Sequence, residues 1–250
     1  MEEFRYTLLK DDLDLVKAEE LQLKYQSLFK KLKIEEFVIL NNITNIAAVD
    51  ISYFKEKSKE YGISCAVLWN ISDNRMVCNT FYNDEVRFPY HPGFLGFREC
   101  RLLTKAVEKL AKKPDLIICD GHGIIHPKRF GEAVQLGFAL NIPSIGVAKK
   151  PFIGYYEYKL LKRKKGNKEP ILSFKPNSIS ISEPELLGYA ICLNDNMKPV
   201  FISRGYRATL NLAIDIALKT TLNHRQPEPL YLAHQLSKKR VKDRQTHRKS

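Results

Sequence analysis

The sequence has no apolar run approaching the roughly 20 residues that a membrane-spanning helix requires. Its first residues, MEEFRYTLLKDD, contain no apolar core of a signal peptide. Its five cysteines show neither a C-x-x-C pair nor a spacing typical of zinc sites. These absences argue against a membrane protein, a secreted disulfide scaffold and a zinc ribbon. We therefore expect a soluble intracellular protein, located in the reducing cytoplasm.

Acidic residues are also scarce, because 28 Asp and Glu stand against 41 Lys and Arg, a net charge of +13. The excess is concentrated in residues 157–169 and 236–250. Such clustering favours a polyanionic partner, nucleic acid first. The alternative is a solvated loop and tail without a partner. We expect residues 237–250 to be a disordered basic tail and residues from about 155 to 182 to be a basic insertion.

The rest of the chain alternates between apolar runs and amphipathic segments. At 250 residues its length suits one α/β domain, here assigned to residues 1–236. Helices are predicted over 12–33, about 92–112, 129–141 and 209–222. Strands are predicted over 46–53, 63–69, 76–82, 115–120, 143–148, 187–193 and 200–203. No internal repeat is present. Three early strands followed by alternating helices and strands imply a mixed sheet with helices on both faces.

Polar residues that could take part in catalysis or ligand binding follow two of these strands. The run 116–119 stops at Asp120, which precedes Gly121-His122-Gly123 and His126. The run 144–148 ends at Lys149. Open α/β sheets keep their active sites where parallel strands end, so this edge is the expected site.

Two further acids are predicted to point into the core. Asp50 lies inside the apolar strand IAAVDI, and Glu99 shares a helix face with Leu95 and Leu102. Burial and mutual repulsion with Asp120 both oppose ionisation, and a divalent cation reverses both effects. Oxygen-rich ligation suits Mg²⁺, with Mn²⁺ able to substitute. The alternative is that each acid is paired with an Arg or Lys in a structural ion pair.

Four motifs resemble the endonuclease V family, and together with a C-terminal match they cover residues from about 15 to 236 in family order. The motifs are VDISY at 49–53, PYHPGFLGFRE at 89–99, DGHGIIHP at 120–127 and IGVAKK at 145–150, followed by PEP and AH at 227–234. The resemblance implies a ribonuclease H-like fold. It also implies a DNA repair activity, cleavage of a strand at the second phosphodiester bond 3′ to deoxyinosine.

The resemblance assigns roles to particular residues. Asp50 and Asp120 would hold Mg²⁺, Glu99 would complete the acidic site, and His234 occupies a position where the family places a metal-site His or Asp. Lys149 would stabilise the phosphate during cleavage.

Other residues would contact the nucleic acid. His126 would touch the phosphate or the bound nucleotide, unless it is a capping or core histidine. Tyr90 is the expected wedge that enters the base stack, and His91 departs from the aliphatic residue usual beside it. The pocket for the flipped base would be formed by Gly93, Leu95, Gly121 and Gly146. His122 receives no role.

Two other functions stay open at this point. The substrate could be inosine-containing single-stranded RNA instead of DNA, since no residue settles which sugar is accepted. The chain could also be a non-catalytic nucleic-acid-binding module in which Gly121 to Gly123 cradle a phosphate. We expect a monomer in each case.

Overall fold

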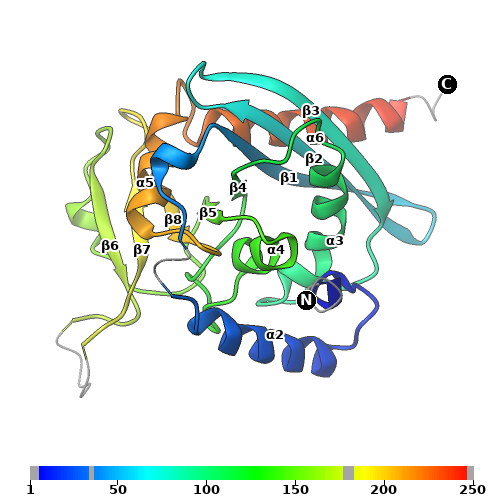
Figure 1. Ribbon diagram of the computed structural model, residues 1–250, viewed down its shortest axis with the longest axis horizontal. Helices are drawn as coiled ribbons and strands as arrows, with labels where there is room; N and C mark the ends of the chain where they lie inside the picture. The colour runs from blue at the N-terminus through cyan, green and yellow to red at the C-terminus, as the bar shows by residue number, and fades with distance from the viewer. Residues whose placement is uncertain (1–5, 34–36, 177–182, 247–250) are drawn as a thin grey trace.

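An eight-stranded mixed sheet forms the centre of the structure, a computed structural model that describes residues 6–33, 37–176 and 183–246 (Figure 1). The strand order is β3-β2-β1-β4-β5-β8-β7-β6. The strands are β1 (Asn45–Glu56), β2 (Lys59–Asn70), β3 (Arg75–Glu85), β4 (Leu116–Cys119), β5 (Ser144–Ala148), β6 (Lys168–Leu172), β7 (Leu186–Ile191) and β8 (Val200–Arg204).

Only the centre of the sheet is parallel. β1, β2 and β3 form an antiparallel meander, whereas β1, β4 and β5 run parallel to one another. β8, β7 and β6 then continue the sheet in antiparallel fashion. The short strands β4 and β5 are buried along their whole length, as expected for parallel strands covered on both faces. The carboxyl ends of β4 and β5 therefore lie near each other, and the end of β4 lies beside Val49 in the middle of the longer strand β1.

Helices cover both faces of this sheet. Helices α3 (Leu95–Glu108) and α4 (Glu132–Leu140) pack on the face that carries Ala47 and Val49. Helices α5 (Leu210–Lys219) and α6 (Glu228–Thr246) pack on the face that carries Ile46 and Ala48. Successive side chains of β1 thus point alternately to the two faces of the sheet and contribute to the hydrophobic core on each face. Among the described residues, no helix has the length and apolar character of a membrane span.

Helix α2 (Leu15–Lys30) lies outside this layer, along the lower edge in Figure 1. Its Tyr25 and Phe29 meet Phe130 and Phe138 edge-on. Three short 3₁₀ helices complete the described elements: η1 (Tyr6–Leu9), η3 (Leu40–Asn42) and η4 (Tyr158–Leu160).

The predicted mixed sheet with helices on both faces is confirmed. Two segments differ from their predictions. The segment expected to be an insertion or loop contains the edge strand β6, which pairs with β7 in antiparallel register; its residues 177–182 lie outside the described part of the chain. Polar composition alone concealed this strand, because an edge strand needs a ladder partner and little apolar content.

The prediction of a disordered tail from residue 237 is wrong for residues 237–246, which continue α6. Ser237 and Val241 are buried on the face of α6 that meets the sheet. Arg240 stacks over Phe81 on β3, and Arg244 stacks over Phe54 on β1. One buried side chain per turn and two cation–π contacts hold this basic segment against the sheet. Residues 247–250 lie outside the described residues.

Candidate metal centre and base pocket

Two carboxylates and an imidazole converge where β4 ends, beside the middle of the longer strand β1. Val49 pairs with Cys119 in the parallel ladder, so Asp50 and Asp120 come from adjacent strands at the same level. His234, on α6, places Nδ1 3.2 Å from Oδ2 of Asp50. One ligand atom from each of Asp50, Asp120 and His234 lies within 4.8 Å of the others. The structure therefore brings together three of the four residues expected to hold a metal.

A serine that the sequence analysis did not single out fixes the orientation of Asp50. The Ser237 hydroxyl donates to Oδ2 of Asp50 at 2.9 Å. Ser237 also lies 2.8 Å from the hydroxyl of Ser52. Because Ser237 follows His234 by three residues, both face the sheet from one side of α6. The three-residue spacing could have predicted that Ser237 lies beside His234, but only if α6 were known to extend past residue 236.

Asp120 is paired with Lys149, whose ammonium group donates to Oδ2 of the carboxylate from the end of β5. Burial raises the pKa of Asp120, while the Lys149 charge opposes the rise and Asp50 adds to it. The Lys149 side chain is 40% exposed, so it lies at the mouth of the cluster. The single ammonium group of Lys149 thus stands against the two carboxylates of Asp50 and Asp120, so the negative charge of this cluster is only partly balanced. Carboxylate oxygens with one imidazole suit a hard divalent cation.

Glu99 lies beside this cluster, on α3. It is 8% exposed, which confirms that it faces inward. The Tyr53 hydroxyl donates to its Oε1. Burial raises the pKa of Glu99 to about 7, although hydrogen bonds with Tyr53 and Glu132 oppose the rise and the charge of Asp50 reinforces it.

Glu132 is a fourth buried acid that the sequence analysis missed. It opens α4 and is 4% exposed. Burial raises its pKa well above the usual range, and the neighbouring charge of Glu99 adds to the rise. The signal was an acid at the head of the otherwise apolar segment AVQLGFAL. An acid in the first turn of a helix is ordinarily an exposed residue that favours the helix dipole, which is why it attracted no notice.

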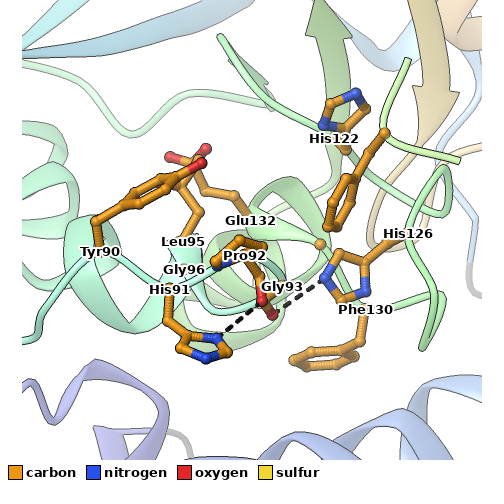
Figure 2. Close-up of a pocket in the computed structure, with 12 residues that line it drawn as sticks. Tyr90, His91, Pro92, Gly93, Leu95, Gly96, His122, His126, Phe130 and Glu132 are labelled. Carbon is orange, nitrogen blue, oxygen red and sulfur yellow. Dashed lines mark hydrogen bonds between the residues drawn. The ribbon is translucent and has the colours of Figure 1, made fainter. Parts of the chain in front are cut away.

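A pocket of about 170 Å³ has Glu132, whose charge interacts with Glu99, Asp120 and Asp50, in its wall (Figure 2). Five of the predicted nucleic-acid contacts line it: Tyr90, His91, Gly93, Leu95 and His126. The remaining wall includes His122, Phe130, Glu132 and Phe152. Gly121 and Gly146, also predicted to form the pocket, are not among its lining residues. Any side chain at Gly146 would collide with the backbone of Gly121 and Gly123, so these glycines are required by packing.

Gly93 and His126 are held together by a hydrogen bond. Gly93 has a φ of +87°, which favours glycine, and its carbonyl oxygen accepts from Nε2 of His126 at 3.1 Å. The other ring nitrogen, Nδ1, accepts from the backbone N–H of Lys128. Burial lowers the pKa of His126 to about 4, so the ring is neutral. Both nitrogens are occupied by backbone groups, an arrangement that favours the core-histidine alternative over phosphate contact.

Tyr90 and His91 differ in exposure and in contacts. Tyr90 is 71% exposed at the tip of its loop, as a wedge requires. The His91 ring meets the edge of Phe94 at 5.4 Å between centroids, and its Nδ1 lies 3.1 Å from the Pro92 carbonyl oxygen. His91 is thus held by its own loop, and Tyr90 is the side chain left to project.

Phe152, on the opposite wall, was not predicted to take part. Its ring is 39% exposed and lies 5.9 Å from the ring of His122 and 5.5 Å from that of His126. His122 in turn places Nε2 2.8 Å from the Lys150 carbonyl oxygen. Together these rings form an aromatic wall on which a flat ligand can stack.

Basic side chains continue away from the cluster along α6. Lys238, Lys239 and Lys242, here called the α6 lysines, are exposed. At 1.5 Å per residue they lie roughly 6 to 12 Å beyond His234 along the helix axis. Because α6 is one continuous helix, their distance from the acidic cluster is fixed.

Comparisons with known proteins agree with this geometry. Residues 26–235 match the family model described as endonuclease V. The endonuclease V of Dictyoglomus turgidum is 47% identical over 155 residues, which span 62% of this chain and 63% of that protein. The endonuclease V of Dictyoglomus thermophilum is 40% identical over 198 residues, 79% of this chain and 80% of that protein.

A solved structure shares the fold. It is the endonuclease V of Ciona intestinalis in complex with a 24mer DNA containing an inosine followed by a ribo-adenosine, with 25% identity and a TM-score of 0.76, covering 92% of this chain and 98% of that one. The sheet with its flanking helices is therefore ribonuclease H-like, as expected. Given the matched family model and the long, well-covered alignment to its relatives, this chain belongs to the endonuclease V family of nucleases.

Proposed function

We propose that this protein is a metal-dependent endonuclease that cuts DNA at the second phosphodiester bond 3′ to deoxyinosine, as a step in DNA repair. The observation that carries the proposal is the convergence of Asp50, Asp120 and His234 beside a pocket large enough for one base. Neither feature alone would suffice, because acidic clusters and pockets are each common. Their adjacency supports a reaction on the strand next to a bound base.

The residues present fit a divalent cation. Asp50, Asp120 and His234 would hold Mg²⁺, with Mn²⁺ able to substitute, and Glu99 stands next to them. When bound, the cation lowers the pKa of a coordinated water and neutralises charge on the scissile phosphate. The pKa of Asp120 and that of Glu99, both raised by burial, indicate that these carboxyls lack sufficient positive charge around them.

Other side chains would act directly on the strand. Lys149, at the mouth of the cluster, would exchange its contact with Asp120 for the scissile phosphate and stabilise its developing charge. Tyr90 would occupy the place in the base stack that the extruded base vacates. Unstacking a mispaired base costs less free energy than unstacking a paired one. The pocket would receive the extruded base against the Phe152 ring. The α6 lysines would contact flanking phosphates through charge alone.

Inosine-containing RNA is the second candidate substrate. The specific reason to retain it is that the neighbouring Ciona complex contains a ribo-adenosine after the inosine. The cytoplasmic location and the monomeric state stay predictions.

The decisive experiment compares matched DNA and RNA oligonucleotides, each with one inosine or one adenine, in Mg²⁺ and in EDTA. We expect cleavage of the inosine strand in Mg²⁺ alone, at the second bond on the 3′ side. Asp120→Asn keeps the size of the side chain and should abolish cutting while preserving binding. Binding without cutting by the unaltered protein would identify a non-catalytic module. A preference for the RNA strand would transfer the assignment to the second candidate.

A further inference from the structure

A second basic surface lies at the edge of the sheet where Lys149 stands. It consists of residues 159–168, here called the β6 arm, which span the end of η4, the following turn and the first residue of β6. The ladder registers place four residues at one level across β5, β8, β7 and β6: Ala148, Phe201, Ala190 and Glu169. Lys149 and Lys168 each lie one residue beyond that level, on the same side. The rest of the arm therefore projects past the edge at which β5 ends.

The β6 arm carries unbalanced positive charge. It contains no Asp or Glu, and its basic side chains are all exposed: Lys159, Lys162, Arg163, Lys164, Lys165 and Lys168. Among the described residues, no acid forms an ion pair with any of them. Glu157 and Glu169 flank the arm in the sequence, and Asp195 lies beside its backbone. An exposed surface with such an excess of one sign attracts a partner of the opposite charge.

The backbone of the arm is fixed against the connection between β7 and β8. The Arg163 carbonyl oxygen accepts from the backbone N–H of Asn196 at 2.8 Å. The backbone N–H of Lys165 donates to the carboxylate of Asp195 at 2.6 Å. These bonds use the backbone of the arm, so its basic side chains are held in place and are left to meet a partner.

Arg225 joins the same connection to the end of β5. Its Nη2 donates to the carbonyl oxygens of Lys149 at 2.8 Å and Pro199 at 2.6 Å. Its Nε donates to the carbonyl oxygen of Lys198 at 3.2 Å. Lys149, the connection between β7 and β8, and the β6 arm are therefore linked by hydrogen bonds. The distance from the arm to the acidic cluster is fixed in consequence.

The β6 arm and the α6 lysines lie on opposite sides of the acidic cluster. The cluster stands at β1 and β4, α6 packs on β1 and β2, and the arm leads into β6 at the other end of the strand order. Figure 1 shows β6 and the end of α6 at opposite sides of the molecule. β7 and β6 are the third and fourth strands from β4. At about 4.8 Å per strand they lie roughly 14 and 19 Å away, the length of about four to six base pairs of duplex.

We propose that the β6 arm binds the phosphate backbone of the nucleic acid on one flank of the bound base, while the α6 lysines bind the opposite flank. This inference rests on the proposed function, because it assumes that the strand crosses the acidic cluster. Nucleic acid fits the arm in charge and in place, because a duplex that reaches the cluster and extends about six base pairs along this edge meets the arm. The contact acts through charge and reads no sequence.

The first test replaces Lys162, Arg163, Lys164 and Lys165 together by Gln, which keeps the backbone of the arm. The probe is a duplex with one inosine, about twelve base pairs on each side, and 2-aminopurine beside the inosine, whose fluorescence reports unstacking at the lesion. Titrations in EDTA measure affinity without cutting. The slope of log affinity against log salt should fall by up to about 3.6, at 0.9 per phosphate contact. The melting temperature should be unchanged because the replaced side chains are exposed.

The matched control for loss of surface charge is Lys112→Gln with Lys113→Gln, exposed ahead of β4 at the far end from Asp120. This control should keep the wild-type slope. A wild-type slope in the arm variant as well would overturn the inference and assign the arm to a partner other than nucleic acid.

The second test uses two shortened duplexes, each with about two base pairs on one side of the inosine and about twelve on the other, in opposite orders. Two base pairs do not reach the arm. On one of these duplexes the arm variant should bind like the wild type, while the α6 lysine variant stays weakened. An arm effect that survives both truncations, or two sets of variants that lose their effect on the same duplex, would overturn the inference. Failure of the wild type to cut the inosine strand in Mg²⁺, with this binding pattern intact, would overturn only the proposed function.

Discussion

Glu99→Gln should stabilise the metal-free protein while impairing its activity. Glutamine keeps the size of the side chain and the oxygen that accepts from Tyr53, but it removes the ionisable group. Burial raises the pKa of Glu99 to about 7 in the folded protein, against 4.5 for the ordinary group. The folded state therefore binds this proton more tightly than the unfolded chain does. Wild-type stability consequently falls as the pH rises from about 4.5 to about 7.

The size of the effect follows from the same two values. At about 1.36 kcal/mol per pH unit, the difference between 4.5 and about 7 corresponds to about 3 kcal/mol at pH 8. For a chain of this size, this is a rise of roughly 6 to 12 °C in melting temperature. At pH 5 the wild-type Glu99 is still protonated in the folded state, so the variant and the wild type should differ little.

Urea unfolding in EDTA measures the free energy of unfolding of the variant and of the wild type at pH 5 and at pH 8. The single tryptophan, Trp69, is 3% exposed and so reports loss of the core by its fluorescence. The control is Glu108→Gln at the end of the same helix, where an exposed ion pair with Lys105 contributes less than about 1 kcal/mol. Equal stability of Glu99→Gln and the wild type at pH 8 would refute the reasoning, as would the same gain at both pH values.

Two further predictions concern contacts with the strand. Tyr90→Ala should reduce discrimination between inosine and adenine strands by about ten-fold, since part of the selectivity arises from unstacking; its melting temperature should be unchanged because the ring is exposed, and full discrimination would exclude the wedge. Replacing all three α6 lysines by Gln should lower the slope of log affinity against log salt on duplex DNA by up to about 2.7. The double variant of Lys112 and Lys113, exposed ahead of β4 at the far end from Asp120, should leave that slope unaltered. Equal slopes in the two sets would show that α6 is no contact surface.

Much of the fold was accessible from local pattern. The alternation and the apolar runs of β1, β4 and β5 predicted their positions to within a few residues, because buried parallel strands tolerate little else. The inward placement of Glu99 followed from helical periodicity, since Leu95 and Leu102 fix the face of α3. What local pattern missed was β6 and the end of α6, two polar segments whose structure depends on a partner surface.

The acidic site shows the same division. Asp50 and Asp120 could be identified one by one, since Asp50 interrupts an apolar run and Asp120 ends another. Their proximity to His234 could be known only from the tertiary structure. His234 lies 184 residues from Asp50 in the sequence, and the packing of α6 on β1 brings the two side chains together.

The sequence by itself determined the class of fold, the carboxylates that interrupt or end apolar runs, and the family. The tertiary structure alone decided that Ser237 orients Asp50, that His126 is held by backbone groups, and that Glu132 lies between the acids and the pocket. The physical reason is that apolar periodicity is written locally along each element. The partner of a polar group is instead supplied by whichever distant element packs against it.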